Sequence, residues 1–247
     1  MHSFSFATTD LSAYGLVVNS VDVNRLRQEL SLVQLQDRAY SFSPKSPPRI
    51  ISLGCTVIGD TRADLDSKLD AIKEVLRTDG VQELKLDSIT DRYFSALLES
   101  FGGAYRGLSL FEGTISFVCP DPLAYDNEPT VSPHIVESSP DSFNEVVGGN
   151  AVAVPVWKIQ PSVAVNGKVT LRNDTRSEEI EWTGVLNGST DYLEIDSETW
   201  VVKKNGTADM SSVAGEFPKL TGGVTNAIET TGFTGGTVTA TYSKRYL

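Results

Sequence analysis

The stretch that decides the fold reads RIISLGCTVI at 49–58, GDTRADLDSKLDAIKEVLRTDG at 59–80 and VQELKLD at 81–87. Its first and last parts favour strands, because β-branched and alternating residues suit a half-buried sheet. In the middle part, apolar residues recur every three or four positions, as on one face of a helix. They are Leu65, Leu69, Ile72 and Leu76. Thr61 is expected to cap this helix, about 61–78, and Gly80 to end it in a left-handed conformation.

The flanking segments predict further strands around this strand–helix–strand scaffold. Residues 91–99 and 108–118 alternate between apolar and polar, and the glycine-rich segment 101–107 between them reads as a turn. Residues 25–48 end in a proline cluster and are expected to form a projecting hairpin or arm. One helix among several strands predicts an α+β N-terminal domain, mostly β, over residues 1–127.

Composition changes after this first domain. Residues 128–150 contain three prolines, four acidic residues and no Lys or Arg, and they predict an acidic connector that could include the first strand of the next domain. Residues 151–247 then alternate throughout. Three Asn-Gly pairs, at 166–167, 187–188 and 205–206, are typical of two-residue hairpin turns. The pattern predicts an all-β C-terminal domain, a β-sandwich.

Charge and composition exclude several classes of function. The net charge is −11 and no basic block exists, so specific nucleic-acid binding is not expected. No apolar run approaches the ~20 residues that cross a bilayer, and no signal peptide is recognisable, so synthesis in a reducing cytoplasm is expected. The two cysteines, Cys55 and Cys119, lie in apolar strand-like segments, which favours buried free thiols over a disulfide.

Sequence motifs give no support for an enzyme, a metal site or a cofactor. The histidines are His2 and His134 alone, and no nucleotide-binding or nucleophile motif is present. Glu179 and Glu181 could in principle act as a glycosidase pair. They alternate with apolar Ile180, however, which is typical of the solvent-exposed face of a strand.

Aromatic side chains offer a possible binding function in the second domain. Four of them are candidates for stacking on sugars: Trp157, Trp182, Tyr192 and Trp200. The alternative is that the tryptophans fill the core of the sandwich.

Four stretches, taken in order, make nearly the whole chain resemble the distal tail proteins of long-tailed phages, the siphophage tail-component family. They are the unit at 49–87, DRY at 91–93, CPDPLAY at 119–125, and FPKLTGGVTN at 217–226 together with the final RYL. No single motif is specific; their order and spacing carry the resemblance.

The resemblance implies a structural virion protein of the tail tip, without catalytic residues or cofactors. Members form a homo-hexameric ring that joins the tail tube protein to the tail-associated hub protein and offers attachment points for receptor-binding proteins. The second domain is usually a galectin-like or carbohydrate-binding-module-like sandwich, and an OB-like barrel in some members. On this reading Tyr40, Phe42 and Arg92 are candidate inter-subunit contacts, or Tyr40 and Phe42 belong to a local hairpin. The alternative function is a carbohydrate-binding adhesion module acting through residues 151–247.

Overall fold

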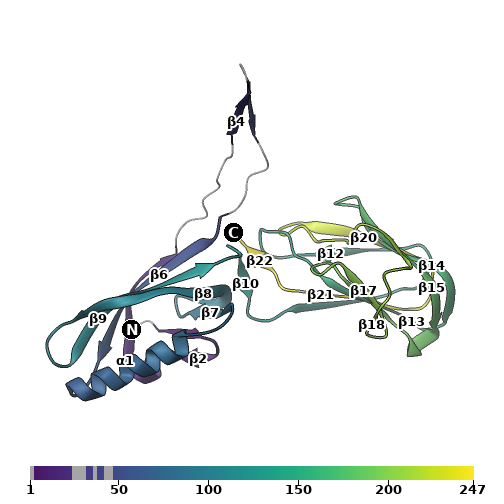
Figure 1. The fold of residues 1–247 in the computed structure, drawn as a ribbon. Helices are drawn as coiled ribbons and strands as arrows, with labels where there is room; N and C mark the ends of the chain where they lie inside the picture. Colours follow the sequence, from purple (N-terminus) through teal and green to yellow (C-terminus); the bar gives the residue numbers. More distant parts are fainter. Residues whose placement is uncertain (1–2, 24–31, 36–37, 42–46) are drawn as a thin grey trace. The chain divides into compact units, whose positions relative to one another are not determined.

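The computed structural model describes residues 3–23, 32–35, 38–41 and 47–247. The chain divides into two compact units, Met1–Ala124 with Leu247, and Tyr125–Tyr246 (Figure 1). Each unit has its own hydrophobic core.

Unit 1 is an antiparallel sheet with one α-helix, α1 (Arg62–Leu76), and one short 3₁₀ helix, η1 (Leu11–Tyr14), among its described residues. Its strands are β1 (Phe4–Phe6), β2 (Thr9–Asp10), β3 (Leu16–Val23), β4 (Leu32–Leu35), β5 (Arg38–Ser41), β6 (Arg49–Ile58), β7 (Gln82–Leu86), β8 (Ile89–Tyr105) and β9 (Leu110–Cys119). The main sheet runs β2-β1-β7-β8-β9-β6-β3, so the strands before and after α1 are separated by two others. The predicted α+β class is confirmed.

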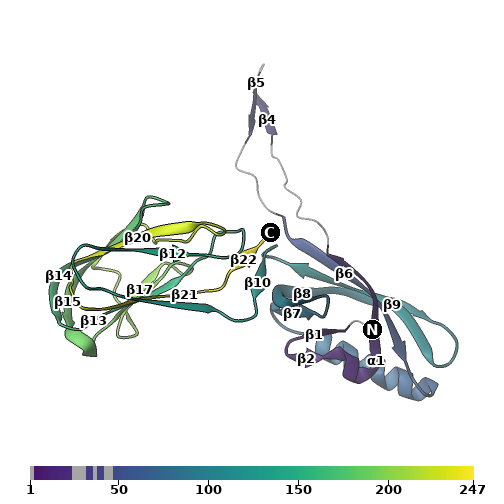
Figure 2. The ribbon, with the colours of Figure 1, turned by 180° about the vertical axis from the view of Figure 1, so that it is seen from behind.

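Helix α1 lies across one face of this sheet (Figures 1 and 2). Its four predicted apolar residues are all buried, and Thr61 caps it by accepting a hydrogen bond from the backbone N–H of Asp64. The predicted ending is wrong, because Gly80 is not among the left-handed residues. The helix ends at Leu76, where Arg77 turns to an extended conformation while its N–H still bonds to the carbonyl of Lys73.

The glycine-rich segment 101–107 is not the turn that the sequence predicted. Strand β8 continues to Tyr105, and the connection to β9 follows it. Gly103 pairs with Gly113 in the register, and a Cβ on Gly103 would clash with the backbone of Glu112. These glycines therefore allow two strands to approach closely, which is the other common use of glycine in a sheet.

Strands β4 and β5 form a two-stranded antiparallel sheet, as expected for a hairpin at 25–48. Tyr40 lies in β5, opposite Val33. The predicted contact residue Phe42 lies outside the described residues.

Unit 2 consists of two antiparallel sheets. Its strands are β11 (Thr130–Ile135), β12 (Asp141–Val146), β13 (Val156–Pro161), β14 (Ala164–Asn173), β15 (Glu178–Asn187), β16 (Leu193–Asp196), β17 (Val201–Lys204), β18 (Thr207–Ala208), β19 (Val213–Gly215), β20 (Thr225–Thr231) and β21 (Gly236–Tyr242), with β10 (Ala124–Asp126) paired to β22 (Arg245–Tyr246). One sheet has the order β11-β21-β13-β16-β17-β18 and the other β12-β20-β14-β15-β19. A 3₁₀ helix, η2 (Gly188–Thr190), follows β15.

Residues 128–150, which the sequence assigned to a connector, contribute β11 to one sheet and β12 to the other. The two sheets enclose a core that includes Trp157 and Ile195 on one side and Leu171 and Trp182 on the other. The predicted sandwich is confirmed. The OB-like alternative is wrong, because the described strands form two separate sheets and no closed barrel.

One of the three Asn-Gly pairs makes the predicted two-residue hairpin. Asn205 and Gly206 connect β17 to β18 with φ angles of 51° and 79°, the positive pair that such a turn requires. The pair at 166–167 lies inside β14, and the pair at 187–188 leads into η2. The dipeptide tolerates a tight turn without requiring one.

Both cysteines are free and buried, as predicted. Burial raises the pKa of each thiol, of Cys55 and of Cys119, to about 11. Within the described part of the chain, no helix has the length and apolar character needed to cross a membrane.

Candidate functional site

Two of the four aromatic residues proposed to stack on sugars are core residues. Trp157 and Trp182 are buried, with 0% and 2% of their surface exposed. The indole N–H of Trp157 donates to the carbonyl of Pro218 at 3.1 Å, and that of Trp182 donates to the Asp209 carboxylate at 3.0 Å. Neither ring has an open face, so the structure corrects these two assignments in favour of the core alternative.

Tyr192 is half-buried, and its neighbours are already engaged. The Lys158 ammonium lies 4.5 Å from the centre of its ring, and the Glu194 carboxylate accepts a hydrogen bond from Lys203 at 2.8 Å. The Asp196 carboxylate accepts backbone hydrogen bonds from its own turn. The carboxylates of Glu194 and Asp196 are therefore engaged by the fold.

Trp200 is the exposed member of the set, with 62% of its surface accessible. It ends the turn between β16 and β17 with φ = 59°, a conformation that bulky residues rarely adopt. The Ser197 hydroxyl anchors this turn by donating to the carbonyl of Pro218 at 2.8 Å. The turn is thus fixed to the segment that follows β19.

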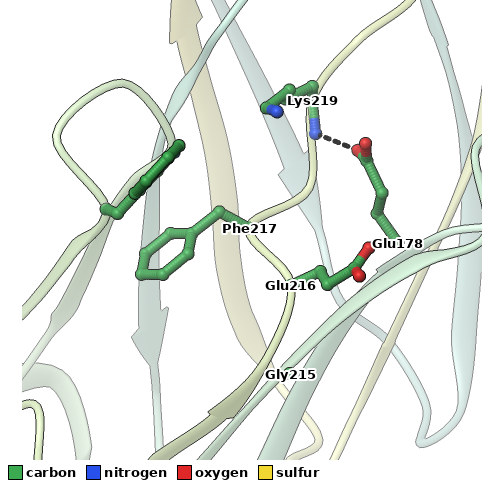
Figure 3. A pocket seen from close by; sticks show the side chains of 6 residues that line it. Glu178, Gly215, Glu216, Phe217 and Lys219 are labelled. Atoms are coloured by element: carbon green, nitrogen blue, oxygen red, sulfur yellow. Dashed lines mark hydrogen bonds between the residues drawn. The ribbon is translucent and has the colours of Figure 1, made fainter.

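Trp200 lies at a hollow of about 460 Å³ in unit 2. The residues that line the hollow are Glu178, Trp200, Gly215, Glu216, Phe217 and Lys219 (Figure 3). Gly215 ends β19, and its φ of 99° redirects the chain away from β15. Three separate segments of the sequence, from β15, the β16–β17 turn and the chain after β19, therefore meet here.

The buried Glu178 side chain fixes the backbone at one wall of this hollow. Its carboxylate accepts a hydrogen bond from the backbone N–H of Lys219 at 2.7 Å, drawn in Figure 3, and another from the Arg176 side chain at 3.0 Å. By contrast, the side chains of Glu216 and Lys219 make no ion pair or hydrogen bond with the described residues. One acceptor and one donor group are therefore available at the hollow.

The segment FPKLTGGVTN at 217–226 owes its rigidity to two buried asparagines. The side-chain carbonyl of Asn226 accepts from the backbone N–H of Thr221 at 2.9 Å and from the Asn173 amide at 3.2 Å. Asn173 also donates to the carbonyl of Lys219 at 2.6 Å. Sequence reasoning singled out this segment for the family resemblance but missed Glu216, Phe217 and Lys219 as site residues, since nothing local shows that they meet Trp200.

Glu179 and Glu181 lie on the half-exposed face of β15 and alternate with buried Ile180 and Trp182. Glu181 forms an ion pair with Lys168 of β14, as expected for an exposed strand face. No group of three or more His, Cys, Asp or Glu side chains among the described residues is arranged to hold a metal ion.

The candidate inter-subunit residues lie in unit 1. Arg92 is half-buried in β8, and its guanidinium lies 3.4 Å from the Asp91 carboxylate. Tyr40 belongs to β5, apart from the sheet that contains Arg92. A contact of either residue with a second subunit stays a prediction.

The fold defines a two-domain, β-rich protein: a sheet braced by one helix, followed by a β-sandwich. Residues 148–246 match the family model of the siphovirus-type tail component, C-terminal domain. The C-terminal domain thus matches the siphovirus-type tail components, and the resemblance predicted from the sequence is confirmed. No curated protein matches the sequence.

Solved structures extend the similarity to the whole fold. The crystal structure of the Dit protein (gp 19.1) of phage SPP1, described as a paradigm of the hub adsorption apparatus in phages that infect Gram-positive bacteria, covers 100% of both chains with a TM-score of 0.83 at 17% identity. A chain of the phage P2 baseplate in its activated conformation with calcium covers 99% of this chain and 98% of its own, with a TM-score of 0.54 at 10% identity. A chain of the same baseplate in its activated conformation with strontium covers 98% of this chain and 98% of its own, with a TM-score of 0.52 at 10% identity.

Proposed function

We propose that the protein is the distal tail adaptor of a siphophage. In this role it forms a hexameric ring that joins the tail tube to the hub protein and to the receptor-binding proteins. The observation that carries the proposal is the fold similarity to SPP1 Dit over the full length of both chains, together with the tail-component match of the C-terminal domain. The protein would be made in the host cytoplasm and reside at the tail tip of the virion.

An open sheet edge in unit 1 supports assembly with further copies. Strand β3 has eight residues and, among the residues that the structure describes, ends the order of the main sheet, where it pairs with β6 on one side. A long edge strand presents unpaired backbone groups, which natural proteins cover or use for association. A ring of subunits is one way to cover this edge.

A structural, non-enzymatic role agrees with the chemistry of the described residues. Glu181 pairs with Lys168, Glu194 pairs with Lys203, and both thiols are buried. These groups serve the stability of the fold, so the protein needs no reaction to account for them.

Labelling of intact virions tests the location. Gold-conjugated antibodies raised against residues 1–247 should decorate one end of the tail, opposite the capsid, in electron micrographs. Labelling distributed along the tail tube, or confined to the capsid, would contradict the adaptor role.

The alternative of a carbohydrate-binding module now depends on Trp200. Of the four proposed rings, it is the one that combines an open face with a hollow.

A further inference from the structure

We propose that the free edge of β12 is a docking site for an extended, basic segment of another protein, which adds to the sheet as a further strand. The inference goes beyond the adaptor role, because it concerns a peptide-binding edge of unit 2 and holds for a single chain as well as for a ring.

The backbone of β12 leaves three residues without a partner strand. β12 ends the order of its sheet and pairs with β20 on one side (Figure 1). Just after β12, the backbone N–H of Val147 donates to the carbonyl of Val224 at 3.3 Å, so Val147 faces the β20 side. Because the direction of backbone groups alternates along a strand, those of Ser142, Asn144 and Val146 point away from β20. They make no hydrogen bond with any other residue that the structure describes.

The other terminal strands of the two sheets in unit 2 are protected against such pairing. β18 and β19 have two and three residues, and very short edge strands offer little to a partner. β11 is longer, but its Val136 neighbour bonds to Gly236 on the β21 side at 3.1 Å, so Pro133 occupies an outward-facing position without an N–H. β12 has six residues and contains neither Pro nor Lys. Among the described residues, it is therefore the edge of this sandwich that can accept a strand.

β12 is held in place by contacts with the opposite sheet. The Glu145 carboxylate, which is 6% exposed, accepts hydrogen bonds from the Ser132 and Tyr242 hydroxyls at 2.7 Å each. The ring of Phe143 stacks on that of His134 with 4.1 Å between their centres. An inward-pointing charge can protect an edge strand, but this carboxylate is already engaged inside the sandwich. The edge is thus preformed, which lowers the entropic cost of binding.

The charge around the edge selects a basic partner. Residues 128–150 contain four acidic residues and no Lys or Arg. Glu137 precedes β12, and Glu229 of β20 lies opposite Ser142 in the register. Neither carboxylate forms an ion pair with the part of the chain that the structure describes. Lys or Arg side chains on the incoming strand are therefore attracted, and an acidic segment is repelled.

The exposed side chains of β12 favour an extended segment over a second copy of the same strand. Ser142 and Asn144 are short and polar, and Val146, with 71% of its surface exposed, offers one apolar contact. A segment of about six residues covers all three and bonds to their backbone groups. Pairing β12 with β12 of another copy would instead bring Glu137 and Glu229 of both chains together.

A synthetic peptide added to the full-length protein tests the proposal. The probe is an acetylated peptide of about eight residues in which lysine and valine alternate, and the matched probe carries glutamate in place of lysine. Fluorescence anisotropy should show saturable binding of the lysine peptide, about tenfold tighter or more than that of the glutamate peptide. Hydrogen exchange followed by NMR should slow at the amides of Ser142, Asn144 and Val146 when the lysine peptide binds.

Asn144→Pro removes one outward-facing N–H and leaves the bonds between β12 and β20 in place. It should weaken binding of the lysine peptide about tenfold or more, whereas the matched control Asn144→Ala, which keeps the N–H, should bind within about threefold of the wild type. Glu229→Gln, which keeps the backbone unchanged, should weaken binding about threefold and reduce its dependence on salt. Circular dichroism and thermal unfolding verify that each variant is folded.

The proposal is overturned if the lysine peptide does not bind, if the glutamate peptide binds as tightly, or if folded Asn144→Pro binds like the wild type. It is also overturned if exchange at Asn144 is already slow in the concentrated free protein and becomes faster on dilution, because β12 would then pair with a second copy. If Asn144→Pro does not fold, the two peptides and Glu229→Gln decide the question. The mass of the same samples in solution reports ring formation separately, so failure of the adaptor role is distinguished from failure of this site.

Discussion

The indole N–H of Trp157 donates a hydrogen bond to the backbone carbonyl of Pro218, at 3.1 Å, inside the C-terminal sandwich. The same carbonyl accepts the Ser197 hydroxyl, so one backbone oxygen connects the core to the turn that presents Trp200. Two tryptophans that look equivalent in the sequence therefore have opposite roles. Trp157 is buried in the core, and Trp200 is exposed to solvent.

Alanine substitutions at these two tryptophans should separate the roles. Trp157→Ala removes a buried ring and a hydrogen bond, and should lower the free energy of unfolding by about 3–5 kcal/mol. Trp200→Ala removes an exposed ring and should change it by about 0.5 kcal/mol or less. Urea denaturation of both variants measures the difference, and equal losses at the two positions would refute the assignment.

Leu69 should be essential for unit 1 and irrelevant for unit 2. It is buried on the face of α1 that covers the sheet, so Leu69→Ala should destabilise unit 1 by about 2–5 kcal/mol. Glu74→Ala, on the exposed face of the same helix, is the control and should cost about 0.5 kcal/mol or less.

Hydrogen–deuterium exchange resolves the two units in this experiment. Faster exchange in Leu69→Ala should be confined to residues of unit 1, because the sandwich has its own core. Equal acceleration in both units would show that they unfold as one body.

The two thiols should be unreactive in the folded protein. Burial raises the pKa of Cys55 and Cys119 to about 11, so few thiolates exist at pH 8 and reagents have little access to them. A colorimetric disulfide reagent should react slowly with the native protein and promptly with both thiols in urea. Rapid reaction of either thiol without denaturant would contradict their burial.

Asp191 should make unit 2 sensitive to acid. A hydrogen bond from the backbone N–H of Asn187, and another from the Asn205 amide, lower the pKa of the Asp191 carboxyl below its ordinary value of 3.8. The ionised form is therefore favoured in the folded state. The stability that it contributes is present above about pH 3.8 and is lost as the pH falls through the lowered pKa.

Thermal unfolding of wild type and Asp191→Asn over a pH series checks this sign. The wild type should be more stable near neutral pH, and the difference should shrink as the pH falls below about 3.8. A difference that is constant or grows in acid would mean that the carboxylate is not held in its ionised form.

Local patterns predicted the elements whose causes are local. The spacing of Leu65, Leu69 and Ile72 requires one buried helix face, and the Thr61 side chain caps that helix wherever it packs. The hairpin at Asn205 and Gly206 was also predicted from the local sequence. In these cases the residues that form the structure are neighbours in sequence.

The sequence did not predict features that depend on contacts between residues distant in the chain. Gly103 reads as a turn residue, yet it permits the close approach of Gly113 across the β8–β9 pair. Trp157 and Trp200 have the same residue type, and only the register of β13 and the turn after β16 makes one buried and the other exposed. The hollow combines Glu178, Trp200 and the segment 215–219, which come from three separate parts of the sequence, and no local pattern reveals that they meet.

The mass of the purified full-length protein in solution tests the central claim, a ring-forming tail adaptor, most directly. Multi-angle light scattering at high protein concentration, with negative-stain microscopy of the same fractions, should show a species of six chains that appears as a closed ring. A single chain that remains monomeric at the highest soluble concentration would contradict the account.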